Sequence, residues 1–214
     1  MTKEEFEQKL KDKKIWWCPL PWTHIFSSLS GRYAPCYDAL GKTGHNMKDT
    51  TIREWYTSDY QNKLRKEMLK EDYDGKFFDE HCTGCRKHEK LYGRSDRQKY
   101  VEQVLAGTFD NKVPQLLRAV FKFQKEGKID LDERLLDIKM KMFGNACNLD
   151  CYMCHPRSAN TRTISLNKVF KNTGKVFDPD LDPKDGERMN TMKHDEEEYL
   201  NDVASVAKYT KSIK

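Results

Sequence analysis

Apolar residues recur at intervals of three or four along much of the chain, which is the spacing of one face of an α-helix. Tyr60, Leu64 and Met68, for example, follow one another at intervals of four. This pattern predicts helices over 50–58 and 59–71, with Leu64 and Met68 in the core.

Apolar and polar residues alternate in three shorter runs, as they do in β-strands. Two of these runs, 23–29 and 32–36, flank Gly31, and this arrangement predicts a β-hairpin. The third run, 135–143, reads LLDIKMKMF and predicts another strand.

Helical spacing returns in the segments 98–130 and 157–172. The last segment, 195–213, begins with acidic residues and ends with lysines, which suits the dipole of a helix. We therefore predict helices in all three segments, and a short charged helix or a frayed terminus over 1–14.

Composition restricts the class of protein. Of the 214 residues, 37% are hydrophobic and 34% are charged, and the mean hydropathy is −0.92. No apolar run approaches the roughly 20 residues of a membrane span, and the N-terminus lacks the apolar stretch of a secretory signal. We expect a cytoplasmic protein without membrane association.

The net charge of +5 comes from interleaved acidic and basic residues, so nothing indicates a nucleic-acid-binding surface.

The cysteines carry the strongest chemical signal. The chain has seven, an odd number without an export signal, so a disulfide framework explains them poorly. The first group is Cys18, Cys36, Cys82 and Cys85, and the second is Cys147, Cys151 and Cys154. Four ligands followed by three indicate two metal sites.

The second group has gaps of three and two residues and follows the predicted strand at 135–143. This spacing lets one short loop bring three thiolates to one iron–sulfur cluster. In a cluster of four irons, three thiolates leave one iron free to bind a small molecule. Two other interpretations remain open. The three cysteines could be small buried residues that pack like hydrophobic ones, or they could bind a structural zinc ion with His155 as the fourth ligand.

In spacing and setting, this segment resembles the radical S-adenosylmethionine (radical SAM) enzymes, whose C-x3-C-x2-C signature follows the first strand of a (β/α) barrel. The resemblance implies that Cys147, Cys151 and Cys154 bind a [4Fe–4S] cluster whose open iron binds S-adenosyl-L-methionine. Reductive cleavage of that cofactor yields a 5′-deoxyadenosyl radical for hydrogen abstraction. Met153 occupies the position before the third cysteine, which is often aromatic in the family, with Tyr152 beside it, and the resemblance implies that both contact the cofactor.

The first group extends over 18–85. Its first cysteine, Cys18, begins the sequence CPLPW. Cys18, Gly31 and Cys36 then form a C-x12-G-x4-C pattern, and Cys82 and Cys85 form a C-x-x-C pair. Four thiolates are a complete set of ligands for one iron–sulfur cluster or one zinc ion. Gly84, inside the C-x-x-C pair, predicts a tight backbone knuckle.

This segment resembles the twitch and SPASM modules that accompany many radical SAM enzymes. It shares their CPLPW-like motif, the G-x4-C spacing, the helix motif Ile52–Trp55 and a C-x-x-C-x3-E sequence that ends at Glu89. The sequence lacks the further cysteines of a full SPASM module, so it matches a shorter, twitch-like module with one auxiliary [4Fe–4S] cluster. By this resemblance, the cluster ligands are Cys18, Cys36, Cys82 and Cys85. The aromatic residues expected to shield the cluster are Trp16, Trp17, Trp22 and Phe26.

These motifs predict an α/β fold, α+β overall, in four segments. They are a charged N-terminal segment (1–14), the twitch/SPASM-like module (15–97), a helical linker (98–130) and the first part of a radical SAM barrel (131–214). Sixty residues follow Cys154, enough for about one and a half β/α units, and the family's Gly-Gly-Glu-like motif does not occur. We therefore expect a truncated or split protein whose strand at 135–143 forms an exposed sheet edge.

The resemblance implies a radical SAM enzyme, or its N-terminal portion, acting on a peptide, protein or small-molecule substrate. The implied partners are an electron donor such as flavodoxin or ferredoxin and a second chain that completes the barrel. The alternatives are a non-catalytic iron–sulfur accessory or electron-transfer protein and a zinc-stabilised interaction module. Such a module could bind nucleic acid through a basic run that nearby acidic residues weaken. That run is Arg86, Lys87, Lys90, Arg94, Arg97 and Lys99.

Overall fold

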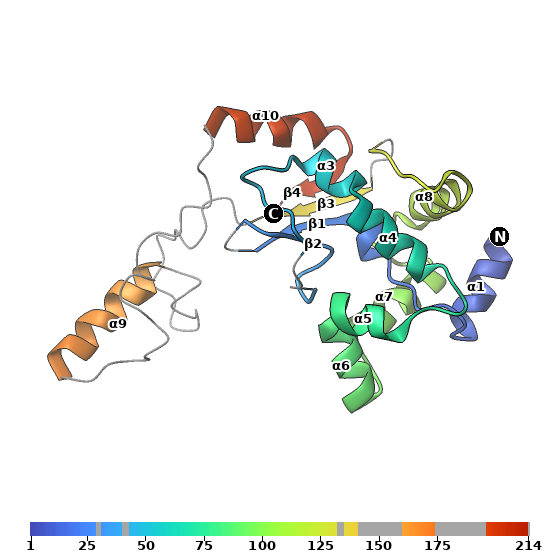
Figure 1. Ribbon diagram of the computed structural model, residues 1–214, viewed down its shortest axis with the longest axis horizontal. Helices are drawn as coiled ribbons and strands as arrows, with labels where there is room; N and C mark the ends of the chain where they lie inside the picture. The colour runs from blue at the N-terminus through green and yellow to red at the C-terminus, as the bar shows by residue number, and fades with distance from the viewer. Residues whose placement is uncertain (29–30, 40–42, 132–134, 141–159, 174–195, 214) are drawn as a thin grey trace.

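Four strands of the computed structural model form one sheet in the order β2-β1-β3-β4, with helices around it (Figure 1). The structure describes residues 1–28, 31–39, 43–131, 135–140, 160–173 and 196–213. The strands are β1 (His24–Ser27), β2 (Tyr33–Ala34), β3 (Leu136–Lys139) and β4 (Thr210–Ile213). The helices are α1 (Lys3–Lys11), α2 (Leu20–Thr23), α3 (Ile52–Thr57), α4 (Asp59–Met68), α5 (Gly75–His81), α6 (Thr83–Tyr92), α7 (Asp96–Leu105), α8 (Val113–Glu126), α9 (Asn160–Thr173) and α10 (Glu196–Ala207). The fold is therefore of mixed α and β structure, as the sequence predicts.

β1 and β2 form the hairpin that the sequence predicts. They pair antiparallel, with Phe26 opposite Ala34, and Gly31 in the connection has a φ of 74°. This left-handed conformation costs glycine little, which explains the residue type at the turn. Because the chain reverses here, Cys36 returns towards the segment that precedes β1.

β3 is an inner strand of the described sheet. It pairs in parallel with β1, where Ile25 lies opposite Ile138, and with β4, where Leu136 lies opposite Thr210. The prediction that this strand forms an exposed edge is therefore wrong for Leu136–Lys139, because the edges of the described sheet are β2 and β4. The rest of that prediction, at 141–143, lies outside the described residues. A local pattern predicts that a run of residues forms a strand, but it does not predict which distant strands pair with it.

The C-terminal segment departs from the single helix that the sequence predicts there. α10 ends at Ala207, and Thr210–Ile213 form β4. The carbonyl of Tyr209 accepts hydrogen bonds from the N–H groups of Leu135 and Leu136, at 3.1 and 3.2 Å. Backbone pairing with β3 thus outweighs the local helical pattern. β3 and β4 are parallel neighbours, and the connection between them contains α9 and α10.

α10 is held against the N-terminal half of the chain. Its Val206 is fully buried. The carboxylate of Asp202 accepts a hydrogen bond of 2.9 Å from the backbone N–H of Ile52, at the start of α3. An acidic group at a helix N-terminus is stabilising, so this contact fixes α10 to α3.

The helices begin and end at residues suited to those positions. Thr2, Thr51 and Ser95 form capping boxes at the starts of α1, α3 and α7. Gly93 and Gly127 end α6 and α8 in the left-handed conformation. The helices predicted over 50–58 and 59–71 and within 1–14 are confirmed. The segment 98–130 is helical as predicted, but its first helix, α7, begins earlier, at Asp96. The helix predicted over 157–172 is confirmed over 160–172, the part that the structure describes. Among the described residues, no helix combines the length and apolar character needed to cross a bilayer.

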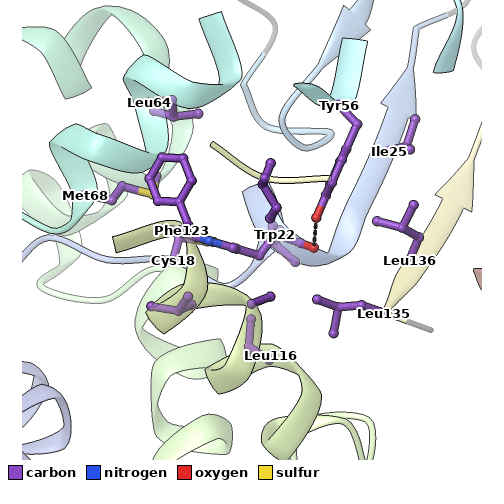
Figure 2. Close-up of a cluster of buried hydrophobic side chains, with 14 of the residues drawn as sticks. Cys18, Trp22, Ile25, Tyr56, Leu64, Met68, Leu116, Phe123, Leu135 and Leu136 are labelled. Carbon is purple, nitrogen blue, oxygen red and sulfur yellow. Dashed lines mark hydrogen bonds between the residues drawn. The ribbon is translucent and has the colours of Figure 1, made fainter. Parts of the chain in front are cut away.

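A shared hydrophobic core connects the sheet to the helices (Figure 2). Trp22, Ile25, Leu116, Phe123 and Leu136 are each at most 1% exposed. They come from α2, β1, α8 and β3, so early and late parts of the chain bury the same surface. Leu64 and Met68, predicted as core residues, are buried in it as well.

Arg65 on α4 is a fully buried basic residue that fastens the CPLPW segment to its neighbours. Its guanidinium donates to the carbonyl of Pro21 at 2.8 and 3.1 Å and to the carbonyl of Tyr56 at 2.8 Å. Tyr56 also donates its hydroxyl to the carbonyl of Trp22 at 2.9 Å (Figure 2). Burial lowers the pKa of Arg65 to about 10, so the side chain stays charged at neutral pH.

Candidate metal centre

Four cysteines from three separate parts of the chain line one cavity of about 30 Å³. Cys18 precedes α2 and Cys36 follows β2, while Cys82 lies between α5 and α6 and Cys85 is in the first turn of α6. All four are free thiols. The structure thus brings the whole first cysteine group to one place.

Backbone N–H groups face the sulfurs of this site. The N–H of Leu20 donates to the Cys18 thiol, and that of Asp38 donates to the Cys36 thiol. The N–H of Ala39 donates to the carbonyl of Cys36 at 3.3 Å. The N–H of Arg97, in the first turn of α7, donates to the Cys85 thiol. Hydrogen bonds to sulfur stabilise metal-bound thiolates and tune the potential of iron–sulfur clusters. The backbone around the cavity is therefore arranged for thiolates.

Burial raises the pKa of all four thiols, and nearby thiols or carboxylates raise it further. For Cys36 the pKa rises to about 12. Without a metal, the thiols are therefore protonated at neutral pH. Binding of a metal as the thiolate complex must release these protons.

Gly84 allows the C-x-x-C segment to lie directly against the loop that follows Cys36. It is part of α6 and its φ is not in the left-handed region, so the knuckle predicted from the sequence is wrong. A β-carbon on Gly84 would lie 2.7 Å from both Cγ and Oδ2 of Asp38. Close approach of two segments, rather than a tight turn, accounts for the glycine.

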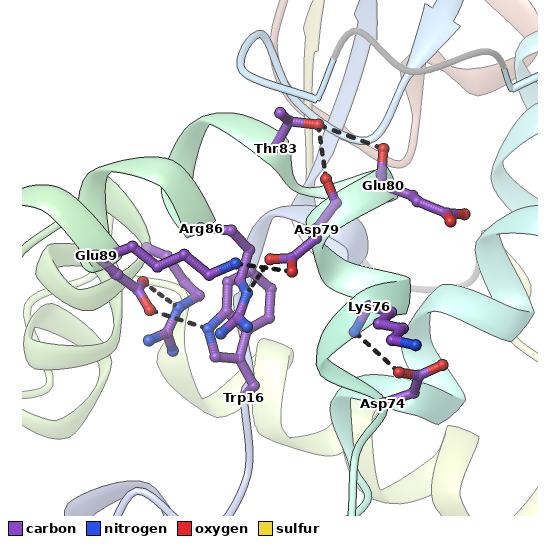
Figure 3. A network of polar contacts seen from close by, with 10 residues as sticks. Trp16, Asp74, Lys76, Asp79, Glu80, Thr83, Arg86 and Glu89 are labelled. Atoms are coloured by element: carbon purple, nitrogen blue, oxygen red, sulfur yellow. Dashed lines mark hydrogen bonds and ion pairs between the residues drawn. The ribbon is translucent and has the colours of Figure 1, made fainter.

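Glu89, the last residue of the C-x-x-C-x3-E motif, joins three segments around the site (Figure 3). It accepts hydrogen bonds from Trp16 Nε1 at 3.0 Å, the Ser95 hydroxyl at 2.6 Å and Arg97 Nε at 2.8 Å. Arg97 also donates to the carbonyl of Trp17 at 3.0 Å. Burial works to raise the pKa of Glu89, but Arg97 and the hydrogen bonds outweigh it and the pKa is lowered. Glu89 is therefore an ionised anchor that holds α6 and α7 beside the cysteines.

The basic residues of this region largely serve ion pairs. Arg86 and Lys90 bind Asp79 at 2.9 and 2.8 Å (Figure 3). Arg94 binds Glu102 at 2.9 Å. The basic run therefore offers less positive charge to a nucleic acid than its composition indicates.

Tyr37 lies between the cysteine cavity and β3. It lines the cavity together with Asp96 and Tyr100, and its hydroxyl donates to the Asp96 carboxylate. The ammonium of Lys139, the last residue of β3, lies 5.9 Å from the centre of the Tyr37 ring. The loop that carries Cys36 thus reaches the carboxyl end of β3.

The aromatic lining differs in part from the expectation. Trp16 lines the cavity, whereas Trp17 and Trp22 are fully buried but are not among the described residues that line it. Phe26 is half-buried and is also not among the lining residues. Tyr37 and Tyr100 line it instead, and no motif or spacing in the sequence points to them.

The second cysteine group lies within 141–159, outside the residues that the structure describes. The predictions that fall there concern Cys147, Cys151, Cys154, Tyr152, Met153 and His155. The structure does show that β3 ends at Lys139, shortly before this group, and pairs in parallel on both sides. In parallel sheets, ligands bind beyond the carboxyl ends of the strands. β3 therefore ends at the edge of the sheet at which parallel sheets bind ligands.

The donor chemistry of the four-cysteine site fits an iron–sulfur cluster or a zinc ion, because both are held by four thiolates. In the described part of the chain, no group of three or more His, Cys, Asp or Glu side chains is arranged to hold a single metal ion, and this includes the four cysteines. The fit therefore lies in the type and number of the donors and not in their present spacing. Comparisons with models of protein families, with curated proteins and with solved structures gave no match. The interpretation of the site rests on its own residues.

Proposed function

We propose that the chain is a radical SAM protein, or the N-terminal portion of one, with an auxiliary [4Fe–4S] cluster at the four-cysteine site. The convergence of Cys18, Cys36, Cys82 and Cys85 on one cavity carries the proposal. Backbone N–H groups beside these sulfurs support the proposal, because they would stabilise the thiolate form that binds a metal.

In this proposal the second cluster is held by Cys147, Cys151 and Cys154, and its open iron binds S-adenosyl-L-methionine. The parallel pairing of β1, β3 and β4 supports the assignment, because β3 is an inner strand of the described sheet and these cysteines follow its carboxyl end in the sequence. When bound, the cluster supplies the electron that cleaves S-adenosylmethionine to methionine and a 5′-deoxyadenosyl radical. The substrate class is a peptide, a protein or a small molecule that can lose a hydrogen atom.

The described residues position and shield the auxiliary site. Glu89 and Arg97 hold α6 and α7 together, so that Cys85 faces the other thiols. Trp16, Tyr37 and Tyr100 restrict water at the cavity, which sets the dielectric around a cluster and hence its potential.

Cleavage of S-adenosylmethionine tests the proposal. Anaerobic protein reduced with dithionite should release methionine, together with 5′-deoxyadenosine once the radical has taken a hydrogen atom. The Cys147→Ala/Cys151→Ala/Cys154→Ala variant should release neither product while retaining the iron of the four-cysteine site. Iron-loaded protein that neither binds nor cleaves S-adenosylmethionine would contradict the radical assignment and support an accessory electron-transfer protein.

A further inference from the structure

A groove of about 510 Å³ shares a wall with the cysteine cavity. Trp16 and Arg97 line both spaces. The groove lies between the C-terminal end of α1 and the helices α6 and α7, with Tyr73 at its side. A molecule bound there would be separated from the thiols by the thickness of this shared wall.

The lining of the groove carries excess positive charge. Its basic members are Lys11, Lys13, Arg86, Arg94 and Arg97, and its acidic members are Glu89 and Glu102. The three arginines are held by carboxylates. Lys11 and Lys13 are exposed, and neither takes part in an ion pair among the described residues. The uncompensated charge therefore lies at these two lysines.

Lys13 occupies a backbone position that favours glycine. Its φ is 56°, just beyond the end of α1. Helices often end with a residue in this left-handed conformation, and it is usually glycine because other side chains are strained there. The turn therefore gives no reason for a lysine at this position, whereas the charge of the groove does.

We propose that the groove is the docking site of an acidic electron-donor protein that reduces the auxiliary cluster. This inference rests on the proposed function, because it requires a cluster at the four cysteines. One electron passes from the reduced centre of the donor to the cluster, so the donor is oxidised by one electron and the cluster is reduced by one. No bond and no proton has to move.

Charge and position favour a protein donor over a small anion as the occupant. Exposed lysines steer an acidic protein surface through their long-range field. They give no fixed hydrogen-bond geometry for a small anion, and the groove's arginines already bind carboxylates. Redox partners also form small, transient interfaces, and a groove of this size can lie at the centre of such an interface. The shared wall would then bring the donor close to the cluster.

Reduction by flavodoxin, an acidic flavoprotein, tests the inference. The full chain carrying Cys147→Ala, Cys151→Ala and Cys154→Ala isolates the auxiliary cluster, and its iron content is measured first. In stopped flow at low salt, Lys11→Glu/Lys13→Glu should lower the bimolecular rate constant about 10-fold or more and flatten its salt dependence. Calorimetric binding of oxidised flavodoxin should weaken in parallel.

Two further variants separate docking from folding. Lys13→Gly removes the side chain but suits the left-handed backbone, so it should slow reduction several-fold without lowering the melting temperature. Lys128→Glu reverses an exposed charge that is not among the groove residues and should leave the rate within about twofold of wild type.

Normal iron content with an unchanged rate of reduction in Lys11→Glu/Lys13→Glu would overturn the docking site alone. Protein without iron would overturn both this inference and the proposed function. Tight binding of inorganic phosphate, lost in Lys11→Glu/Lys13→Glu while flavodoxin reduction stays unchanged, would indicate a small-anion site and overturn the docking site.

Discussion

The carboxyl group of Asp38 lies so close to Gly84 that a β-carbon on the glycine would sit 2.7 Å from Asp38 Oδ2. Asp38 is two residues beyond Cys36, and Gly84 lies between Cys82 and Cys85. This contact therefore sets the distance between two ligand-bearing segments of the site.

Gly84→Ala should push these two segments apart. We expect the free energy of unfolding to fall by about 1–3 kcal/mol, the usual cost of overpacking, and the iron of the four-cysteine site to fall with it. Gly75→Ala is the matched control, because its β-carbon would meet only the end of the flexible Arg86 side chain, at 3.2 Å. Normal iron content in Gly84→Ala would show that the spacing is not critical.

Arg65→Lys tests whether the buried guanidinium fastens the CPLPW segment. A lysine has one ammonium group and cannot satisfy the carbonyls of both Pro21 and Tyr56 in the same geometry. Unfolding in urea should show a loss of about 2 kcal/mol, the cost of leaving a buried acceptor unpaired. Arg53→Lys, at a largely exposed ion pair with Asp130, should cost less than about 1 kcal/mol. Equal effects of the two substitutions would contradict this role.

Glu89→Ala should be more damaging than Glu89→Gln. Alanine leaves the buried Arg97 charge without its carboxylate, which costs about 3 kcal/mol for a buried pair. Glutamine keeps one oxygen, which in the position of Glu89 Oε1 can still accept from Ser95 and Arg97. Both variants should lose auxiliary iron in the order of their instability, as measured by thermal unfolding and iron assay. Glu102→Ala, at an exposed pair, is the control and should retain its iron. Stable Glu89→Ala protein would refute the anchoring role.

Acid should weaken the turn between α4 and α5. Glu67 accepts hydrogen bonds from the N–H of Asp74 at 2.9 Å and from Lys70 at 2.8 Å. Burial works to raise the pKa of Glu67, but these bonds outweigh it and the pKa is lowered. Its stabilising effect is therefore complete above the unfolded pKa of about 4.3 and is lost as the pH falls through the lower folded pKa.

Urea unfolding between pH 6 and pH 3 measures this contribution, as the difference between wild type and Glu67→Gln. The difference should be constant near pH 6 and should shrink as the medium becomes acidic. A difference that stays constant down to pH 3 would mean that the Glu67 carboxylate contributes no pH-dependent stability.

Local patterns were sufficient for the elements that depend on nearby residues. Gly31 and the alternating runs on either side of it predict the β1–β2 hairpin, and helical spacing predicts α3, α4 and α8. In each case the turn residue or the apolar face lies within the segment itself. The four cysteines of the first group could also be singled out, because their residue type is rare and their spacing is ordered.

Contacts between distant segments could not be predicted in this way. The pairing of β1 with β3 and the conversion of Thr210–Ile213 into β4 depend on which strands meet in space. The same holds for Tyr37 and Arg97, which join the site from other parts of the chain. For Gly84, the sequence identified the right residue but the wrong cause, because the opposing Asp38 comes from another segment.

Iron and sulfide analysis of anaerobically purified protein tests the central claim most directly. We expect about eight irons and eight sulfides per chain with a broad absorption near roughly 400 nm. Substitution of alanine for Cys18, Cys36, Cys82 and Cys85 together should leave about four irons, and the same change at Cys147, Cys151 and Cys154 should also leave about four. Colourless protein with stoichiometric zinc, and no iron in any of the three forms, would contradict the iron–sulfur assignment.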